Sequence, residues 1–246
     1  MRFARWQLTL GLALVVLSAL LYTIQYAIFH TPGNIVFYLF QDLAFLPIEV
    51  LLVALILNSL LNLHEKRERL KKMNMVIGAF FSEVGAGLIE RLSAFIPDFP
   101  ELGKPLCIQT GWTPKQFAGA ASALKAREYL IDSRRGNLSG VKRFLFEERV
   151  FLLRLLENPN LLEHDTFTDL LWAVFHLADE LDHRNDLTVL PETDFVHLSG
   201  DMKRAFTLLV VEWLAYMQYL KTDYPYLFSL AVRTNPFDPD ASVIVR

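Results

Sequence analysis

Residues 35–63 read IVFYLFQDLAFLPIEVLLVALILNSLLNL, and this stretch decides the architecture of the 246-residue chain. It is long enough to cross the hydrocarbon core of a bilayer, which needs about 20 helical residues. A second apolar stretch, residues 7–29, precedes it. The five residues between them, His30 to Asn34, include the Pro and Gly of a tight turn. The sequence therefore predicts a hairpin of two transmembrane helices, over about 7–29 and 35–62.

Basic residues flank both ends of this hairpin. Arg2 and Arg5 precede the first stretch, and a lysine- and arginine-rich run over residues 66–72 follows the second. Lys and Arg concentrate on the cytoplasmic side of membrane proteins, so both termini are predicted to be cytoplasmic. A cleaved signal peptide is the less favoured interpretation, because the first apolar stretch is too long. We expect an integral protein of the cell or inner membrane, with the lipid bilayer as its first partner.

Both apolar stretches carry polar side chains that share a helical face. Tyr22 and Gln25 lie on one face of the first, and Gln41, Asp42 and Glu49 fall on one side of the second. Two such stripes are expected to pack against each other. Tyr22 and Asp42 are equally far from the turn and form the best candidate pair.

Glu49 has fewer candidate neighbours in the hairpin. Three interpretations remain open: a position near the inner interface, an ion or proton site, or a contact between protomers. A single hairpin cannot enclose a pore, so a conducting role for Asp42 and Glu49 would require an oligomer.

Residues 64–96 predict a long amphipathic helix that resembles a stalk. Gly78 and Gly85 are seven residues apart, and glycine inside a helix costs about 1 kcal/mol relative to alanine. Close contact with another helix would explain them. The contact is either with a second copy of the chain or with the chain's own domain. The apolar face comprises Leu70, Met73, Ile77, Phe80, Val84, Leu88, Leu92 and Phe95.

Residues 97–246 predict a cytoplasmic helical domain of about five to six helices with an extended C-terminal tail. Thr113-Pro114 has the residues of a helix start, with an N-cap followed by proline. This helix is predicted to run to about Ile131, and a further helix is predicted over residues 139–157. The apolar stretch 205–220 is short for a third span and contains Glu212, which favours a buried core helix. The sequence contains no strand-like alternation longer than a few residues. The predicted fold class is therefore all-α.

The best candidate for chemistry is His176, Glu180 and His183, which share one helical face. Glu180-x-x-His183 has the spacing of di-iron helical bundles, but such bundles need a second Glu-x-x-His, which this sequence lacks. His197 has no matching spacing. The phosphate-binding and nucleophile motifs of common enzyme classes are absent as well. The sequence predicts no catalytic residue, no metal site and no cofactor.

Overall charge and composition narrow the function classes. Hydrophobic residues make up 53% of the chain and the formal net charge is −3, which argues against a nucleic-acid partner. The favoured function is a membrane-anchored helical interaction or signalling subunit that self-associates or binds another membrane protein. One alternative is an oligomeric ion or proton pathway through Asp42 and Glu49. A second alternative is a membrane-bound metal enzyme, and an enzyme is the less favoured class.

Overall fold

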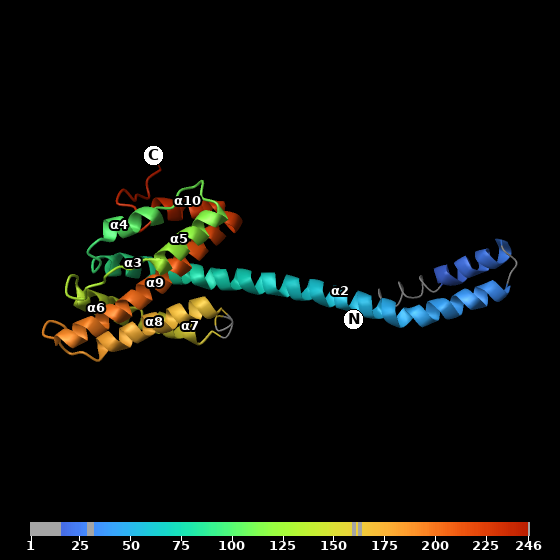
Figure 1. Ribbon diagram of the computed structural model, residues 1–246, viewed down its shortest axis with the longest axis horizontal. Coiled ribbons are helices and arrows are strands. Elements are labelled where there is room, and N and C mark those ends of the chain that lie inside the picture. Colours follow the sequence, from blue (N-terminus) through green and yellow to red (C-terminus); the bar gives the residue numbers. More distant parts are fainter. Residues whose placement is uncertain (1–15, 29–31, 159–160, 162–163, 246) are drawn as a thin grey trace. The chain divides into compact units, whose positions relative to one another are not determined.

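The computed structural model describes residues 16–28, 32–158, 161 and 164–245 (Figure 1). The described residues form helices and loops and contain no strand, which confirms the all-α prediction. The chain divides into two compact units, Met1–Lys66 and Arg67–Arg246, and the boundary falls within helix α2. The predicted turn at residues 30–34 lies partly outside the described residues.

The smaller unit contains the helix Val16–Ile28 and the first part of α2, which runs over Pro32–Phe80. Within the described residues, one helical segment, Val36–Glu65, is long and apolar enough to cross a membrane. The segment Val16–Ile28 is apolar but shorter than a span, and residues 7–15 of the first predicted span lie outside the described residues. The two-span hairpin therefore stays a prediction. Pro47 lies inside α2.

The helix that follows the boundary contributes directly to the core of the larger unit. After Phe80 the chain makes a π-helical turn, η1 (Phe81–Gly85), and continues as α3 (Ala86–Ser93). Seven of the eight positions on the predicted apolar face have described side chains, and all seven are buried. The three- and four-residue spacing of apolar side chains thus predicted the buried face correctly. These positions are Met73, Ile77, Phe80, Val84, Leu88, Leu92 and Phe95.

The next segment contains more helical structure than the sequence predicts. The proline-containing segment after α3 forms a short helix, α4 (Phe99–Gly103), and a 3₁₀ turn, η2 (Lys104–Leu106). Helix α5 (Pro114–Ala126) begins where predicted, with Thr113 as N-cap and Pro114 in the first turn. It ends at Ala126 and does not continue to Ile131.

The predicted helix over residues 139–157 is divided in two. Helix α6 (Leu138–Glu147) and helix α7 (Arg149–Leu156) are separated at Glu148. Together with α4, this division gives seven α-helices between Phe99 and Arg233 in the described residues, more than the five to six predicted.

Two long helices fill the centre of the larger unit. Helix α8 (Asp165–Asp182) packs along α9 (Glu192–Asp223), and α9 also contacts α3, α5 and α10 (Pro225–Arg233). The stretch 205–220 is the buried core of α9, as predicted. The tail after α10 begins with a docked segment, because Phe237 is buried against Trp213 and Asn235 donates to the Leu106 carbonyl at 3.1 Å.

Two glycines offer a matched test of this packing. A Cβ atom at Gly136 would lie 2.6–2.7 Å from ring carbons of the fully buried Phe95, whereas Gly119, inside α5, has open space. We expect Gly136→Ala to lower the free energy of unfolding by about 1–3 kcal/mol through overpacking. Gly119→Ala should raise it by about 1 kcal/mol through helix propensity. Chemical denaturation in detergent measures both, and equal effects would contradict the described packing around Phe95.

Candidate functional site

The polar residues predicted to lie in the membrane are all in the smaller unit. Gln41, Asp42 and Glu49 are exposed on α2. Tyr22 and Gln25 are half-buried, whereas the other residues of Val16–Ile28 are exposed. The two side chains expected to face a neighbouring helix are thus the two that are partly covered. Their pairing with α2 stays a prediction.

Gly78 and Gly85, the predicted oligomer contacts, are buried in the larger unit. A Cβ atom at Gly78 would lie 2.8 Å from the Tyr216 hydroxyl oxygen, and one at Gly85 would meet the rings of Phe81 and Phe80. At both positions the absence of a Cβ atom leaves room for aromatic side chains of the same chain. A role in contacts between copies stays a prediction.

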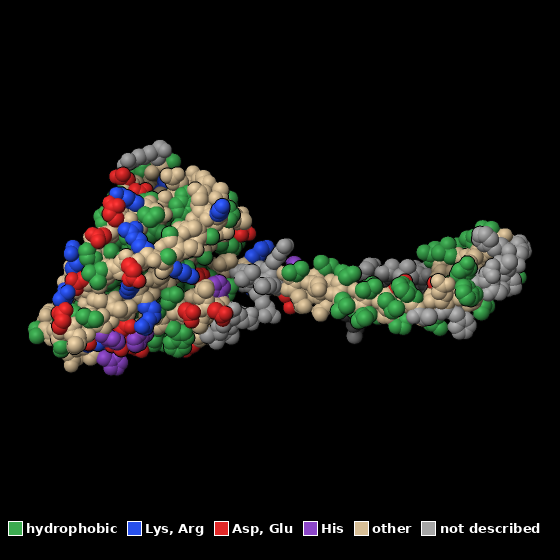
Figure 2. All heavy atoms as spheres, in the orientation of Figure 1, with side chains coloured by type: hydrophobic (Ala, Val, Ile, Leu, Met, Phe, Trp, Pro, Cys, Tyr) green, Lys and Arg blue, Asp and Glu red, His purple; other side chains and the backbone are tan. Residues whose placement is uncertain are grey.

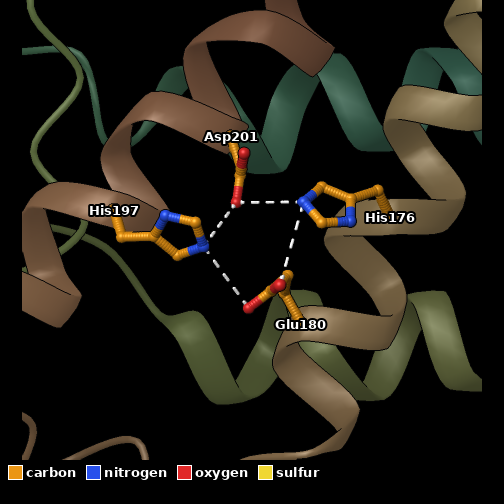
Figure 3. A group of neighbouring side chains, drawn as sticks. All are labelled: His176, Glu180, His197 and Asp201. Atoms are coloured by element: carbon orange, nitrogen blue, oxygen red, sulfur yellow. Dashed lines mark ion pairs between the residues drawn. The ribbon is translucent and has the colours of Figure 1, made fainter.

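A cluster of two histidines and two carboxylates forms where α8 lies against α9. Residues four apart on a helix share a face, so His176 and Glu180 project together from α8. His197 and Asp201 project together from α9 in the same way. Figure 3 shows the four side chains pointing toward one another. His183 is not part of this cluster, and its Nδ1 lies 2.7 Å from the Asp179 carbonyl oxygen.

The distances within the cluster are short. His197 Nε2 lies 3.2 Å from Asp201 Oδ2 and 3.5 Å from Glu180 Oε2. His176 Nε2 lies 3.5 Å from Asp201 Oδ2 and 3.8 Å from Glu180 Oε1. One nitrogen or oxygen atom from each residue lies within 4.8 Å of the other three. Among the described residues, this is the group of histidine and carboxylate side chains able to hold a metal ion.

Each of the two carboxylates, Glu180 and Asp201, also contacts an arginine. Arg184 Nη1 donates to Glu180 Oε2 at 2.7 Å, and the same guanidinium bonds Asp194 at 2.6 and 2.8 Å. Arg204 Nη1 lies 3.3 Å from Asp201 Oδ1. The hydrogen bond from Arg184 lowers the pKa of Glu180, and the charges of Arg184, His197 and His176 lower this pKa further. Glu180 is therefore a stable carboxylate.

Burial differs sharply across the cluster. The Asp201 side chain is 4% exposed, while the side chains of His176 and His197 are 45% and 50% exposed. The buried Asp201 Oδ2 atom makes no hydrogen bond within the described chain. The cluster is thus a partly open site with a buried carboxylate beneath two accessible imidazoles.

The spacing of these four residues can be read from the sequence, but it differs from the Glu-x-x-His spacing of di-iron bundles. The pattern is His-x-x-x-Glu-x-x-x-Arg over residues 176–184 and His-x-x-x-Asp-x-x-Arg over residues 197–204. The di-iron spacing requires two Glu-x-x-His pairs, and neither His197 nor Asp201 belongs to such a pair. Repetition of a histidine–carboxylate pair on consecutive helices is the signal that would have found them.

A second buried carboxyl group lies at the other end of α8. Glu212 of α9 is 5% exposed and accepts a hydrogen bond from Thr166 Oγ1 at 3.0 Å. His164 Nε2 lies 3.9 Å from Glu212 Oε1, while His164 Nδ1 accepts a hydrogen bond from the Phe167 amide and so caps α8. Burial raises the pKa of Glu212, against the opposing effects of His164 and Thr166. This group joins the start of α8 to α9.

The fold and the cluster define an all-helical protein of two units, in which the larger carries a histidine–carboxylate site. The chain belongs to the MJ1433 family. Residues 69–233 match the family described as "Uncharacterized protein MJ1433, C-terminal helical domain", and residues 2–61 match "MJ1433, N-terminal helical domain".

A relative from Methanocaldococcus jannaschii, "Uncharacterized protein MJ1433", is 43% identical over 240 residues, which cover 98% of this chain and 96% of the relative. No solved structure matches the chain.

The raised pKa of Glu212 predicts a pH-dependent stability. A carboxyl group whose pKa rises on folding stabilises the fold below its unfolded pKa of about 4.3, and this contribution is lost as the pH rises through the folded pKa. We expect Glu212→Gln to have the same melting temperature as the native chain near pH 4. Toward pH 8 its melting temperature should become higher than that of the native chain. Thermal unfolding across this range measures the difference. A constant difference between the two proteins would contradict the assignment.

Proposed function

We propose that this protein is an integral membrane protein in which a two-helix hairpin anchors a cytoplasmic helical domain. The domain would act as an interaction or signalling subunit, joined to further copies of the chain or to another membrane protein. The single observation that carries the proposal is the apolar, uncovered surface of Val36–Glu65.

The most apolar 18-residue window of Val36–Glu65 has a mean hydropathy of 2.3, and none of this window is buried. Phe37, Leu43 and Ile56 are each about 60% exposed, at 66%, 62% and 59%. Figure 2 shows apolar side chains along this part of α2. Soluble monomers rarely expose a continuous apolar surface of this extent. Thirty helical residues extend about 45 Å, enough to cross a hydrocarbon core of about 30 Å.

Partial burial of Tyr22 and Gln25 supports a second helix packed beside this segment. The basic residues at both ends support a cytoplasmic location for both termini. Asp42 and Glu49 support an assembly larger than one hairpin, because both are exposed on α2. Ionisable side chains within a membrane usually face protein or a water-filled cavity.

Cysteine accessibility tests both the anchor and its topology. The single native cysteine, Cys107, is replaced by serine, and one new cysteine is introduced as Thr31→Cys or as Ser82→Cys in separate variants. We expect a membrane-impermeant maleimide to label Thr31→Cys in intact cells. It should label Ser82→Cys, on the exposed face of η1, only after the cells are opened.

Fractionation provides the control for this labelling. Both variants should remain with the membrane after an alkaline carbonate wash and dissolve only in detergent. Release of the protein by carbonate would overturn the anchor. Labelling of both positions from the same side would show that Val36–Glu65 does not cross the membrane, and would overturn the proposal.

A further inference from the structure

The cluster between α8 and α9 has the donor set of a metal site. We propose that His176, Glu180, His197 and Asp201 bind one divalent transition-metal ion, with Zn²⁺ as the best-fitting ion. The proposal concerns the larger unit and does not depend on the membrane anchor.

The distances between the donor atoms can be compared with those between the ligands of a zinc ion. Zinc binds histidine nitrogen and carboxylate oxygen at about 2.0–2.2 Å, so neighbouring ligands of a tetrahedral ion are about 3.3–3.6 Å apart. Asp201 Oδ2 lies 3.2 Å from His197 Nε2 and 3.5 Å from His176 Nε2. Glu180 lies 3.5 Å from His197 Nε2 through Oε2 and 3.8 Å from His176 Nε2 through Oε1. A metal ion at the centre of Figure 3 would be in reach of one atom from each side chain.

The buried carboxylate of Asp201 lacks a hydrogen bond at one of its two oxygens. Its Oδ2 atom is buried and makes no hydrogen bond within the described chain, although the Nε2 atoms of both His176 and His197 lie within 3.5 Å of it. An unsatisfied buried carboxylate oxygen is costly. Coordination to a metal ion would satisfy this atom and use both imidazole nitrogens at once.

An arginine side chain orients each of the two carboxylates. Arg184 bonds Glu180 Oε2 and Arg204 lies beside Asp201 Oδ1, which leaves Glu180 Oε1 facing His176 and Asp201 Oδ2 facing both histidines. Partners of this kind orient the ligands of metal sites. Arg184 is itself held by Asp194 through two hydrogen bonds. Helix α8 thus supplies a histidine and a carboxylate, with Arg184 just beyond its end, and α9 supplies a histidine, a carboxylate and Arg204.

The donor types indicate the class of ion. Imidazole with carboxylate suits zinc and the neighbouring divalent transition metals, whereas calcium and magnesium take oxygen ligands alone. The single thiol, Cys107, is engaged elsewhere, with its Sγ 3.1 Å from the Phe237 carbonyl oxygen. The half-exposed histidines leave the bound ion accessible from solvent.

The competing explanation is a set of ion pairs between protonated histidines and the carboxylates. Such pairs contribute little to stability where one partner is half-exposed to solvent, as both histidines are. They do not require a stoichiometric metal, so metal binding separates the two explanations.

The test uses the full chain in detergent, with any affinity tag removed, stripped by a chelator and then dialysed. Isothermal titration with Zn²⁺ should show one ion bound per chain, and Co²⁺ should give the intense visible absorption of a tetrahedral site. We expect His176→Gln and His197→Gln each to weaken Zn²⁺ binding by at least about tenfold. Both side chains are half-exposed, so these variants are expected to fold.

His183→Gln is the matched control, because His183 lies near the end of the same helix but outside the cluster. Its Zn²⁺ affinity should equal that of the native chain. Asp201→Asn provides an independent variant that removes the buried ligand and nearly preserves its volume. The proposal is overturned if neither Zn²⁺ nor Co²⁺ binds at one ion per chain. It is also overturned if His176→Gln, His197→Gln and Asp201→Asn, each folded by circular dichroism, bind as tightly as His183→Gln.

Discussion

The packing of α8 against α9 is the contact on which the larger unit depends. Helix α9 is 32 residues long, and its apolar positions are covered by α8 on one side and by α3, α5 and α10 on others. Fully buried side chains such as Phe206 on α9 and Phe167 on α8 lie in this core. Because side chains in such a core are close-packed, the two helices have one favourable register. That register also places His176 and Glu180 opposite His197 and Asp201.

Helical periodicity was sufficient to predict most of this core. The three- and four-residue spacing of Met73 to Phe95 identified the buried face, and the central glutamate of residues 205–220 identified a core helix. Such features are local, because the side-chain direction follows from the helix geometry alone. The break at Glu148 was missed because the apolar pattern on either side of it is continuous.

The candidate site could be predicted only in part from residues close together in the sequence. Each histidine–carboxylate pair can be read from one helix, since a separation of four residues puts both side chains on the same face. Whether two pairs meet depends on the register between α8 and α9, which arises from core packing between residues distant in sequence. His183 illustrates the difficulty, because it shares the spacing arguments of His176 but bonds instead to the backbone of its own helix. The predicted membrane-spanning segment is the opposite case, because its length and apolarity are properties of one continuous stretch of sequence.

Asp201 is the residue that core packing alone does not explain. Its neighbours along α9, Leu198, Met202 and Ala205, are fully buried and apolar, and a carboxylate among them carries a desolvation cost. Arg204 compensates one oxygen, but the other is buried without a hydrogen bond. A leucine or an asparagine would fit this position at lower cost if folding were the only constraint. Two imidazole nitrogens lie 3.2 and 3.5 Å from this second oxygen, so the proposed metal ion would replace two ion-pair contacts with coordination that all four side chains share.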